Sequence, residues 1–164
     1  MFCSAGFGFG LFFRLLDALP LQALLLFTPF GDLSLRGIES GAEVLILLPG
    51  LTNHRLVAWA AQTHIRPLLE AGCRVWRSPP PFDHSKLMTV DGEWSLIGSP
   101  NWDIRSLRLN FELAVEIYDP GLAARLAEIV DARCAQPITL EDIDQRRFMV
   151  KLRDAAARLC MPYI

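Results

Sequence analysis

Four polar residues in one short stretch carry groups that suit phosphoryl transfer: His84, Lys86, Ser99 and Asn101. A lysine ammonium pairs with the non-bridging oxygens of a phosphodiester, and serine and asparagine donate hydrogen bonds to the charge that develops on those oxygens. A histidine near neutral pH transfers a proton or attacks the phosphorus atom. The carboxylate cluster that Mg²⁺ prefers is missing, and His-x-Lys is not a ligand pair, so we predict a site without a metal ion or cofactor.

The spacing of these residues is more specific than their types. Taken singly, a histidine is more often structural, a lysine is usually solvated, and Gly-Ser or Asn often marks an ordinary turn. Together with Asp91 and Gly98, however, the four residues match the pattern H-x-K-x4-D-x6-G-S-x-N at every fixed position. With six residue types fixed at roughly one in twenty each, a chance match is on the order of 10⁻⁸ per starting position. The pattern therefore indicates a functional site.

Two strand-like runs must position these groups. They are His84–Val90 and Glu93–Ser99, and Asp91-Gly92 between them is a strong signal for a two-residue hairpin turn. Such a turn places the serine opposite the histidine, with the asparagine just beyond the end of the strand. Because side chains alternate along a strand, the histidine and the lysine project from the same face. We therefore expect the four groups to meet at the open end of the hairpin.

The sequence before the hairpin alternates strand and helix patterns. Glu43–Leu48 is a short apolar run typical of a strand buried on both faces, and Cys73–Arg77 alternates as a second strand. Between them, His54–Ala71 has apolar residues at helical spacing and Gly72 at the position of a C-terminal cap, while Pro67 is expected to kink or split the helix. This strand-helix-strand unit predicts an α/β fold with a mixed, largely parallel sheet flanked by helices.

Further elements are expected after the hairpin. Leu107–Tyr118 has the pattern of a strand, and Leu122–Cys134 and Leu140–Leu159 have the patterns of helices. Thr139 precedes the last of these as its N-cap, and Asp142 three residues on completes a capping box. A sheet strand followed by helices is consistent with the α/β class.

Length and composition indicate one domain with an unusual N-terminus. The chain of 164 residues has a net charge of −2 and a pI near 5.9, so it offers no field to attract nucleic acid. Residues 1–27 are apolar, but Arg14 and Asp17 interrupt them and leave stretches shorter than the ~20 residues that cross a bilayer. We interpret 1–27 as a segment that is buried, truncated or wrongly started, or in contact with a membrane interface, and 28–164 as the domain.

The pattern around His84 resembles the signature of the phospholipase D superfamily. Its flanks are similar to the bacterial cardiolipin synthase branch, in the runs 101–106 (NWDIRS) and 109–112 (LNFE). Upstream, the runs 46–49 (ILLP), 54–57 (HRLV) and 68–72 (LLEAG) are similar to that branch as well. The resemblance extends from about Thr28 to the C-terminus. It implies that 28–164 is a phospholipase D-like domain that corresponds to the C-terminal half of such an enzyme.

The resemblance also implies roles for the catalytic residues. His84 takes part in a two-step transfer in which one histidine forms a covalent phosphohistidine and another acts as general acid and then base. In the second half of such enzymes the histidine usually has the acid and base role, although the sequence leaves the nucleophilic role open. Lys86, Ser99 and Asn101 bind the phosphate. Glu112 resembles the acidic residue that orients the histidine through its other ring nitrogen.

Other residues near the pattern have supporting roles. Arg105 is expected to pair with a lipid phosphate or with Glu112, or else to form an ordinary surface salt bridge. Asp91 and Gly98 are interpreted as structural, since the aspartate sits in the predicted turn away from the histidine. Asp83, directly before His84, is a departure from the family pattern, and an acid in that position is expected to raise the pKa of the histidine.

The chain contains one such motif, whereas the reaction needs two. The other histidines, His54 and His64, lack the Lys, Asp, Gly-Ser and Asn that accompany His84. Either two copies of this chain meet about a two-fold axis and form a homodimer, or the chain is a piece of a two-motif enzyme whose N-terminal half is missing.

Three functions are compatible with these observations. The first is a phosphatidyl transferase that makes cardiolipin from phosphatidylglycerol or a related lipid, bound peripherally to the cytoplasmic side of the cell inner membrane. The second is a homodimeric phosphodiesterase or nuclease of the phospholipase D superfamily. The third is an inactive fragment or binding module. The expected partners are therefore a phospholipid, a membrane surface and a second motif, with no nucleic acid expected; the lipid head group and acyl preference stay open.

Overall fold

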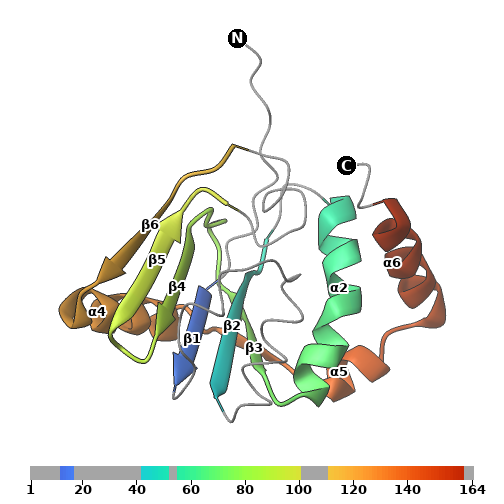
Figure 1. Cartoon of the computed structure of the whole chain (residues 1–164). Helices are drawn as coiled ribbons and strands as arrows, with labels where there is room; N and C mark the ends of the chain where they lie inside the picture. The colour runs from blue at the N-terminus through green and yellow to red at the C-terminus, as the bar shows by residue number, and fades with distance from the viewer. Residues whose placement is uncertain (1–11, 17–41, 52–54, 101–110, 161–164) are drawn as a thin grey trace.

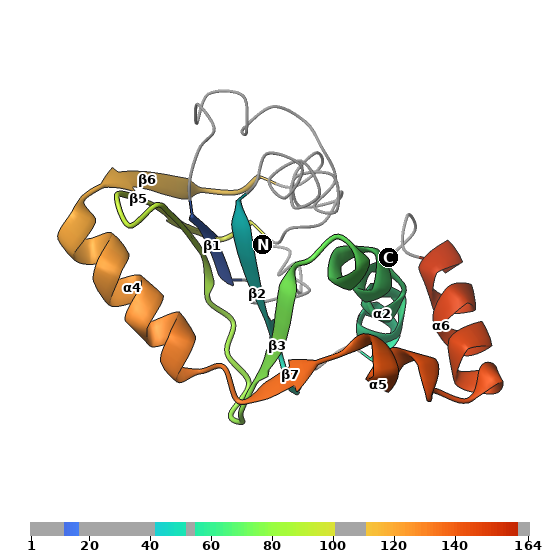
Figure 2. The ribbon, with the colours of Figure 1, turned by 90° about the horizontal axis from the view of Figure 1, so that it is seen from below.

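The computed structural model describes residues 12–16, 42–51, 55–100 and 111–160. Within them the strands form one seven-stranded sheet, and helices cover both of its faces (Figure 1). The strands are β1 (Phe12–Leu16), β2 (Glu43–Pro49), β3 (Arg74–Ser78), β4 (Lys86–Val90), β5 (Trp94–Gly98), β6 (Ala114–Tyr118) and β7 (Gln136–Ile138). The helices are α2 (Arg55–Glu70), α4 (Pro120–Ala132), α5 (Leu140–Asp144) and α6 (Phe148–Cys160). Helix α4 lies on one side of the sheet, and α2, α5 and α6 lie on the other (Figure 2).

The strand order is β6-β5-β4-β1-β2-β3-β7. Strand β1 pairs with β4 and β2 pairs with β3 in parallel, whereas β1–β2, β3–β7, β4–β5 and β5–β6 are antiparallel. The expected α/β class, with a mixed sheet flanked by helices, is confirmed. The expectation of a largely parallel sheet was wrong for the described strands. The helical crossover from β2 to β3 gives a parallel pair, but the chain returns directly from β4 to β5, and a direct return gives antiparallel pairing.

Strand β1 comes from the apolar N-terminal segment and lies between β2 and β4 in the sheet. Its register aligns Phe12 with Leu47 of β2 and with Leu87 of β4. No strand was expected in this segment, because a short apolar run is ambiguous between strand and helix when no turn residues bound it. The division of the chain at residue 27 stays a prediction, since 17–41 lie outside the described residues.

Strand β2 is buried on both faces, as its apolar run predicted, and it separates two hydrophobic cores. Val44 and Ile46 face the layer of α2, where they join a cluster that includes Ile65, Leu68, Val75 and Met88. Leu45 and Leu47 face α4 and join a second cluster that includes Leu87, Leu126 and Val130. The alternation along β2 thus assigns each strand residue to one of the two helical layers.

Helix α2 confirms the predicted helix and its C-terminal cap. Gly72 has a φ of +101°, the left-handed conformation that glycine adopts without steric cost. The amide of Gly72 donates to the carbonyl of Leu69 at 3.0 Å, and the amide of Cys73 donates to that of Leu68 at 2.9 Å. The helix continues through Pro67, so the expected split does not occur.

The predicted helix Leu140–Leu159 was wrong in one respect, because the structure divides it into α5 and α6. Thr139 and Asp142 form the expected capping box at the start of α5. Ile143 of α5 is buried in the core, and the chain then turns at residues 145–147 so that α6 packs along α2 (Figure 1). None of the described helices combines the length and the apolar character needed to cross a membrane.

Strand β6 approaches β5 closely at Gly98. A Cβ atom there would lie 2.5 Å from the carbonyl oxygen of Leu113 and 2.8 Å from the Cα atom of Ala114, so the backbone of β6 would have to move. We therefore expect Gly98→Ala to lower the free energy of unfolding by about 1–3 kcal/mol, the usual cost of overpacking.

Gly121→Ala is the matched control for this substitution, because a Cβ atom at Gly121 would meet a side-chain oxygen of Asp119 at 3.1 Å and no backbone atom. Its unfolding free energy should change by less than about 1 kcal/mol. Denaturant unfolding of both variants measures the difference. Equal losses in the two variants would contradict the close approach of β6 to Gly98.

Candidate active site

The hairpin of β4 and β5 forms as predicted, but its turn is one residue longer. Asp91 and Gly92 have positive φ values of 53° and 69°, as in the turns that suit tight hairpins. The amide of Glu93 donates to the carbonyl of Val90 at 3.1 Å and closes the turn. Val90 pairs with Trp94, so Glu93 belongs to the loop. Asp91 thus lies in the turn, at the far end of β4 from His84, where the sequence placed it, and its structural role stays a prediction.

The longer turn changes the register at the open end of the hairpin. Lys86 pairs with Gly98, whereas a two-residue turn would have placed it opposite Ile97. The predicted position of Ser99 opposite His84 was therefore wrong by one residue. Both residues lie just beyond the strand ends, because β4 begins at Lys86 and β5 ends at Gly98. Among the described residues, the strand expected over Leu107–Tyr118 begins only at Ala114.

Lys86 is buried at the start of β4, with a residue exposure of 6%. Its Nζ contacts Nδ1 of His84 and lies 3.3 Å from Nε2 of the same ring. Because an ammonium group only donates hydrogen bonds, a ring nitrogen that faces it has to be unprotonated. Burial lowers the pKa of Lys86, while the negative charges of Glu112 and Asp83 oppose that shift. The structure therefore brings together the two residues that the pattern placed on one face.

His84 is exposed on one side and packed on the other. The ring of Phe82 meets it edge-on, with centroids 5.8 Å apart. Burial lowers the pKa of His84, the positive charge of Lys86 lowers it further, and Asp83 opposes both effects. Asp83 does raise the pKa of His84, as expected. Burial and Lys86 together lower it by more, so the expectation of a raised pKa was wrong for the net shift.

Both carboxylate oxygens of Asp83 have partners of their own. Its Oδ1 accepts from the amide of Ser85 at 2.8 Å, and its Oδ2 pairs with Arg133 at 3.1 Å. Although burial raises it, the pKa of Asp83 is lowered overall, because of the Ser85 hydrogen bond and the charge of Arg133. Arg133, at the C-terminal end of α4, thus connects that helix to the segment that carries His84. Nothing in the sequence marks Arg133, since an arginine after a helix has no distinctive spacing.

Ser99 and Glu112 meet where β5 ends and the segment before β6 begins. The hydroxyl of Ser99 donates to Oε2 of Glu112 at 2.5 Å and accepts from the amide of Leu113 at 3.0 Å. The amide of Ser99 donates to the carbonyl of Leu113 at 2.9 Å. Ser99 therefore fixes Glu112 beside the motif, and the hydroxyl hydrogen of Ser99 is used in this hydrogen bond. Whether Glu112 also orients His84 stays a prediction.

Two predicted site residues, Asn101 and Arg105, lie outside the described residues. Their roles in phosphate binding stay predictions. Of the others, the structure places Lys86 in contact with His84 and Ser99 in contact with Glu112. Gly98 lies opposite Lys86, where its lack of a side chain leaves room for the close approach of the β6 backbone.

This arrangement can hold a phosphodiester and transfer a proton to its leaving oxygen. The ammonium of Lys86 is the positive group, and it contacts the neutral ring of His84. A phosphate oxygen is a stronger acceptor than an imidazole nitrogen, because it carries negative charge. A bound phosphodiester would therefore take over Lys86 and leave the imidazole free to attack or to transfer a proton.

The chain is similar to known proteins of one family. The family described as "Cardiolipin synthase, PLD-like domain" matches residues 35–134. Cardiolipin synthase 2 of Staphylococcus epidermidis is 35% identical over 126 residues, which cover 76% of this chain and 26% of that protein. The major cardiolipin synthase ClsA of Bacillus subtilis is 35% identical over 127 residues, with the same two coverages. The chain thus spans about a quarter of the length of these relatives.

A solved structure supports the fold. The phospholipase D family member Nuc from Salmonella typhimurium superposes with a TM-score of 0.59 at 21% sequence identity, and the match covers 82% of each chain. The family match includes His84, Lys86, Ser99 and Glu112, the residues whose contacts form the described part of the site. The chain therefore belongs to the family of phospholipase D-like domains of the cardiolipin synthase type.

Proposed function

We propose that this chain supplies one half of the active site of a phosphatidyltransferase that makes cardiolipin from phosphatidylglycerol. The observation that carries the proposal is the contact between His84 and the buried Lys86, beside Ser99 and Glu112, in a domain of the cardiolipin synthase family. A buried cation next to a proton-transfer group is what a phosphodiester substrate needs, since the cation neutralises the phosphate while the histidine acts on the leaving oxygen.

The proposed reaction has two steps, with His84 as the proton carrier. In the first, a histidine of a second motif attacks the phosphorus of one phosphatidylglycerol, and the bond to the head-group glycerol breaks. His84 gives that glycerol oxygen its proton, which produces free glycerol and a phosphatidyl-histidine. In the second step, the neutral His84 takes the proton from a hydroxyl of another phosphatidylglycerol. The oxygen of that hydroxyl attacks the phosphorus, and the histidine of the second motif is released.

The resting state favours a neutral His84, and the substrate would change that. Without substrate, burial lowers the pKa of His84, and the ammonium of Lys86 also disfavours protonation of the ring. A phosphodiester anion bound to Lys86 would remove this effect and favour the imidazolium form instead. Substrate binding would therefore prepare His84 to act as the general acid of the first step.

The second motif is proposed to come from another copy of this chain or from the remainder of a longer protein. The chain has one His-x-Lys motif and spans about a quarter of the length of its curated relatives, which is compatible with either source. Phe111 and Leu113 are exposed on either side of Glu112 and offer apolar area beside the site for such a partner.

The proposed location is the cytoplasmic surface of the cell inner membrane, with α6 as the contact. Helix α6 lies on the outer side of α2 (Figure 2). It exposes large apolar side chains at helical spacing: Phe148, Met149, Leu152 and Leu159. Arg147, Lys151 and Arg158 are exposed next to them. An apolar face bordered by basic residues suits a surface of anionic lipids.

Replacement of Leu152 and Leu159 by Asp should weaken binding to phosphatidylglycerol vesicles at least about tenfold, because two leucines lose their place in the lipid interface. Ile129→Asp is the control, since Ile129 is half exposed on α4, on the other side of the sheet. Vesicle co-sedimentation measures the binding. An equal effect of both variants would contradict α6 as the membrane contact.

His84→Ala should lower the transfer of labelled phosphatidylglycerol into cardiolipin by about 10²–10⁴-fold, the usual contribution of a general acid or base. His64→Ala is the control, because His64 is exposed on α2 and lies outside the motif. The assay is made on the oligomer that the chain forms, or together with the rest of a longer protein if the gene encodes one. Cleavage of a generic phosphodiester without lipid transfer would favour the phosphodiesterase alternative, and undiminished transfer by His84→Ala would contradict the proposal.

The pKa of His84 should lie below its ordinary value of 6.5, first because of burial and second because of Lys86. In Lys86→Gln, the second cause is removed, so the pKa of His84 should rise toward 6.5. A titration of the imidazole resonances by NMR measures both values. A pKa of His84 that is unchanged in Lys86→Gln would contradict the contact between the two side chains.

A further inference from the structure

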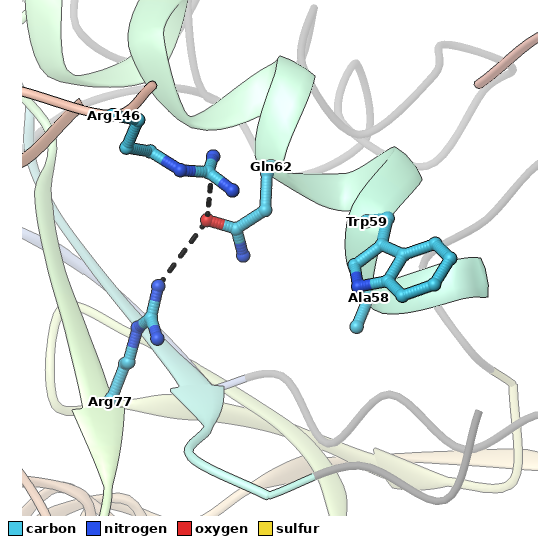
Figure 3. A pocket seen from close by; sticks show the side chains of 5 residues that line it. All are labelled: Ala58, Trp59, Gln62, Arg77 and Arg146. Carbon is cyan, nitrogen blue, oxygen red and sulfur yellow. Dashed lines mark hydrogen bonds between the residues drawn. The ribbon is translucent and has the colours of Figure 1, made fainter. Parts of the chain in front are cut away.

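A second cluster of basic residues lines a cavity of about 310 Å³ outside the motif. Ala58, Trp59 and Gln62 of α2 form one wall, Arg77 of β3 lies below them, and Arg146 comes from the turn between α5 and α6 (Figure 3). Three separate segments of the chain therefore bring two guanidinium groups to one polar pocket.

The two arginines share a single neutral acceptor. Arg77 donates to Oε1 of Gln62 at 3.3 Å, and Arg146 donates to the same oxygen at 3.5 Å (Figure 3). Both distances are long for a guanidinium, whose hydrogen bonds to an anionic oxygen are typically about 2.7–2.9 Å. The amide oxygen of Gln62 thus occupies the place where an anionic oxygen would bind both groups more strongly.

The surrounding charges leave the pocket positive. Asp154 is buried and pairs with Arg146 at 2.5 Å and with Arg153 at 2.8 Å. Arg153 in turn lies over the ring of Trp59, 4.1 Å from its centroid. These contacts fix the orientation of Arg146 and use the buried carboxylate. Burial lowers the pKa of Arg77 and the charge of Arg146 lowers it further, while the negative charge of Asp142 opposes both effects. The two guanidiniums therefore repel each other across the pocket.

The pocket lies on the same face and at the same end of the sheet as the candidate active site. The register aligns Trp76 of β3 with Leu47, Phe12 and Leu87 across the sheet. Arg77 and Lys86 are each one residue beyond this row, toward the same end of the strands. Three strand spacings separate them, which corresponds to about 14 Å. A molecule or surface that reaches Lys86 can therefore present a second anionic group to Arg77.

We propose that Arg77, Arg146 and Gln62 form a second phosphate-binding site, distinct from the one at His84. A phosphate oxygen would replace the amide oxygen between the two guanidiniums, and Gln62 would turn its NH₂ group to donate to the same phosphate. The recognised chemistry is a phosphate group with at least two free oxygens, which either a phosphodiester head group of a lipid or free phosphate provides.

Binding of two soluble probes to the full chain tests this site, in a Lys86→Gln background that weakens the site at His84. The probes are inorganic phosphate and glycerophosphoglycerol, the deacylated form of phosphatidylglycerol. Arg77→Gln should weaken the binding of the preferred probe by about tenfold to a hundredfold, as expected for the loss of a charged hydrogen bond. The control is Arg125→Gln, which removes the same charge from the exposed face of α4 and should change the affinity less than about twofold.

Gln62→Glu is a second variant, and a merely structural role of the arginines would not account for its expected behaviour. A carboxylate at position 62 would pair with both guanidiniums, so the variant should have a higher Tm and should lose probe binding to the same extent as Arg77→Gln. Gln62→Glu keeps the test decisive if Arg77→Gln does not fold, because it adds an interaction and removes none of the charges.

The two probes also distinguish the source of the phosphate. Tighter binding of glycerophosphoglycerol identifies a lipid head group, and tighter binding of inorganic phosphate identifies the free ion; both support the site. Unchanged affinity for both probes in Arg77→Gln and Gln62→Glu would overturn it. Because neither probe has to react, the result is independent of the proposed transferase activity, which can fail while the site stands.

Discussion

A buried ammonium group at the start of β4 is the constraint on which the candidate active site depends. Burial of an unpaired charge costs several kcal/mol, so a lysine at 6% exposure needs compensation from its surroundings. Here the compensation comes from the ring of His84 and from the negative charges of Glu112 and Asp83. The two acids are fixed by different segments. Ser99 holds Glu112, and Arg133 at the C-terminal end of α4 holds Asp83. The site is therefore built around Lys86, and the sheet and α4 serve to keep its partners in place.

The sequence predicted the strands of the hairpin better than their register. Hydrophobic patterns and the Asp91-Gly92 signal were enough for the strands on either side of the turn, because those features are local. The register was missed because the inclusion of Glu93 in the loop depends on how the hairpin twists against its neighbours. Similarly, Thr139 and Asp142 predicted the start of α5, but the break before α6 depends on the packing of α6 against α2 and on the burial of Asp154.

Long-range contacts were the features least accessible from sequence. The pair of Asp83 with Arg133 joins residues of ordinary type at no characteristic spacing, and so does the meeting of Arg77 with Arg146 at Gln62. The central place of β1 was also missed, since its partners lie far along the chain in β2 and β4, the nearest pair being Leu16 and Glu43, and no local signal marks the pairing. The fold places the C-terminal end of β3 and the N-terminal end of β4 at the same end of the sheet. The two clusters of positive charge, at Lys86 and at Arg77, therefore both lie at that end, on the face covered by α2.

Displacement of His84 from Lys86 by a phosphodiester connects the fold to the proposed chemistry. The pKa of His84, followed by NMR with and without saturating glycerophosphoglycerol, tests it most directly. If the phosphate takes over the ammonium group, its negative charge next to the ring should raise the pKa of His84 above the value without ligand. A pKa that stays the same or falls when the probe binds would contradict the exchange, and with it the account of Lys86 as the phosphate ligand.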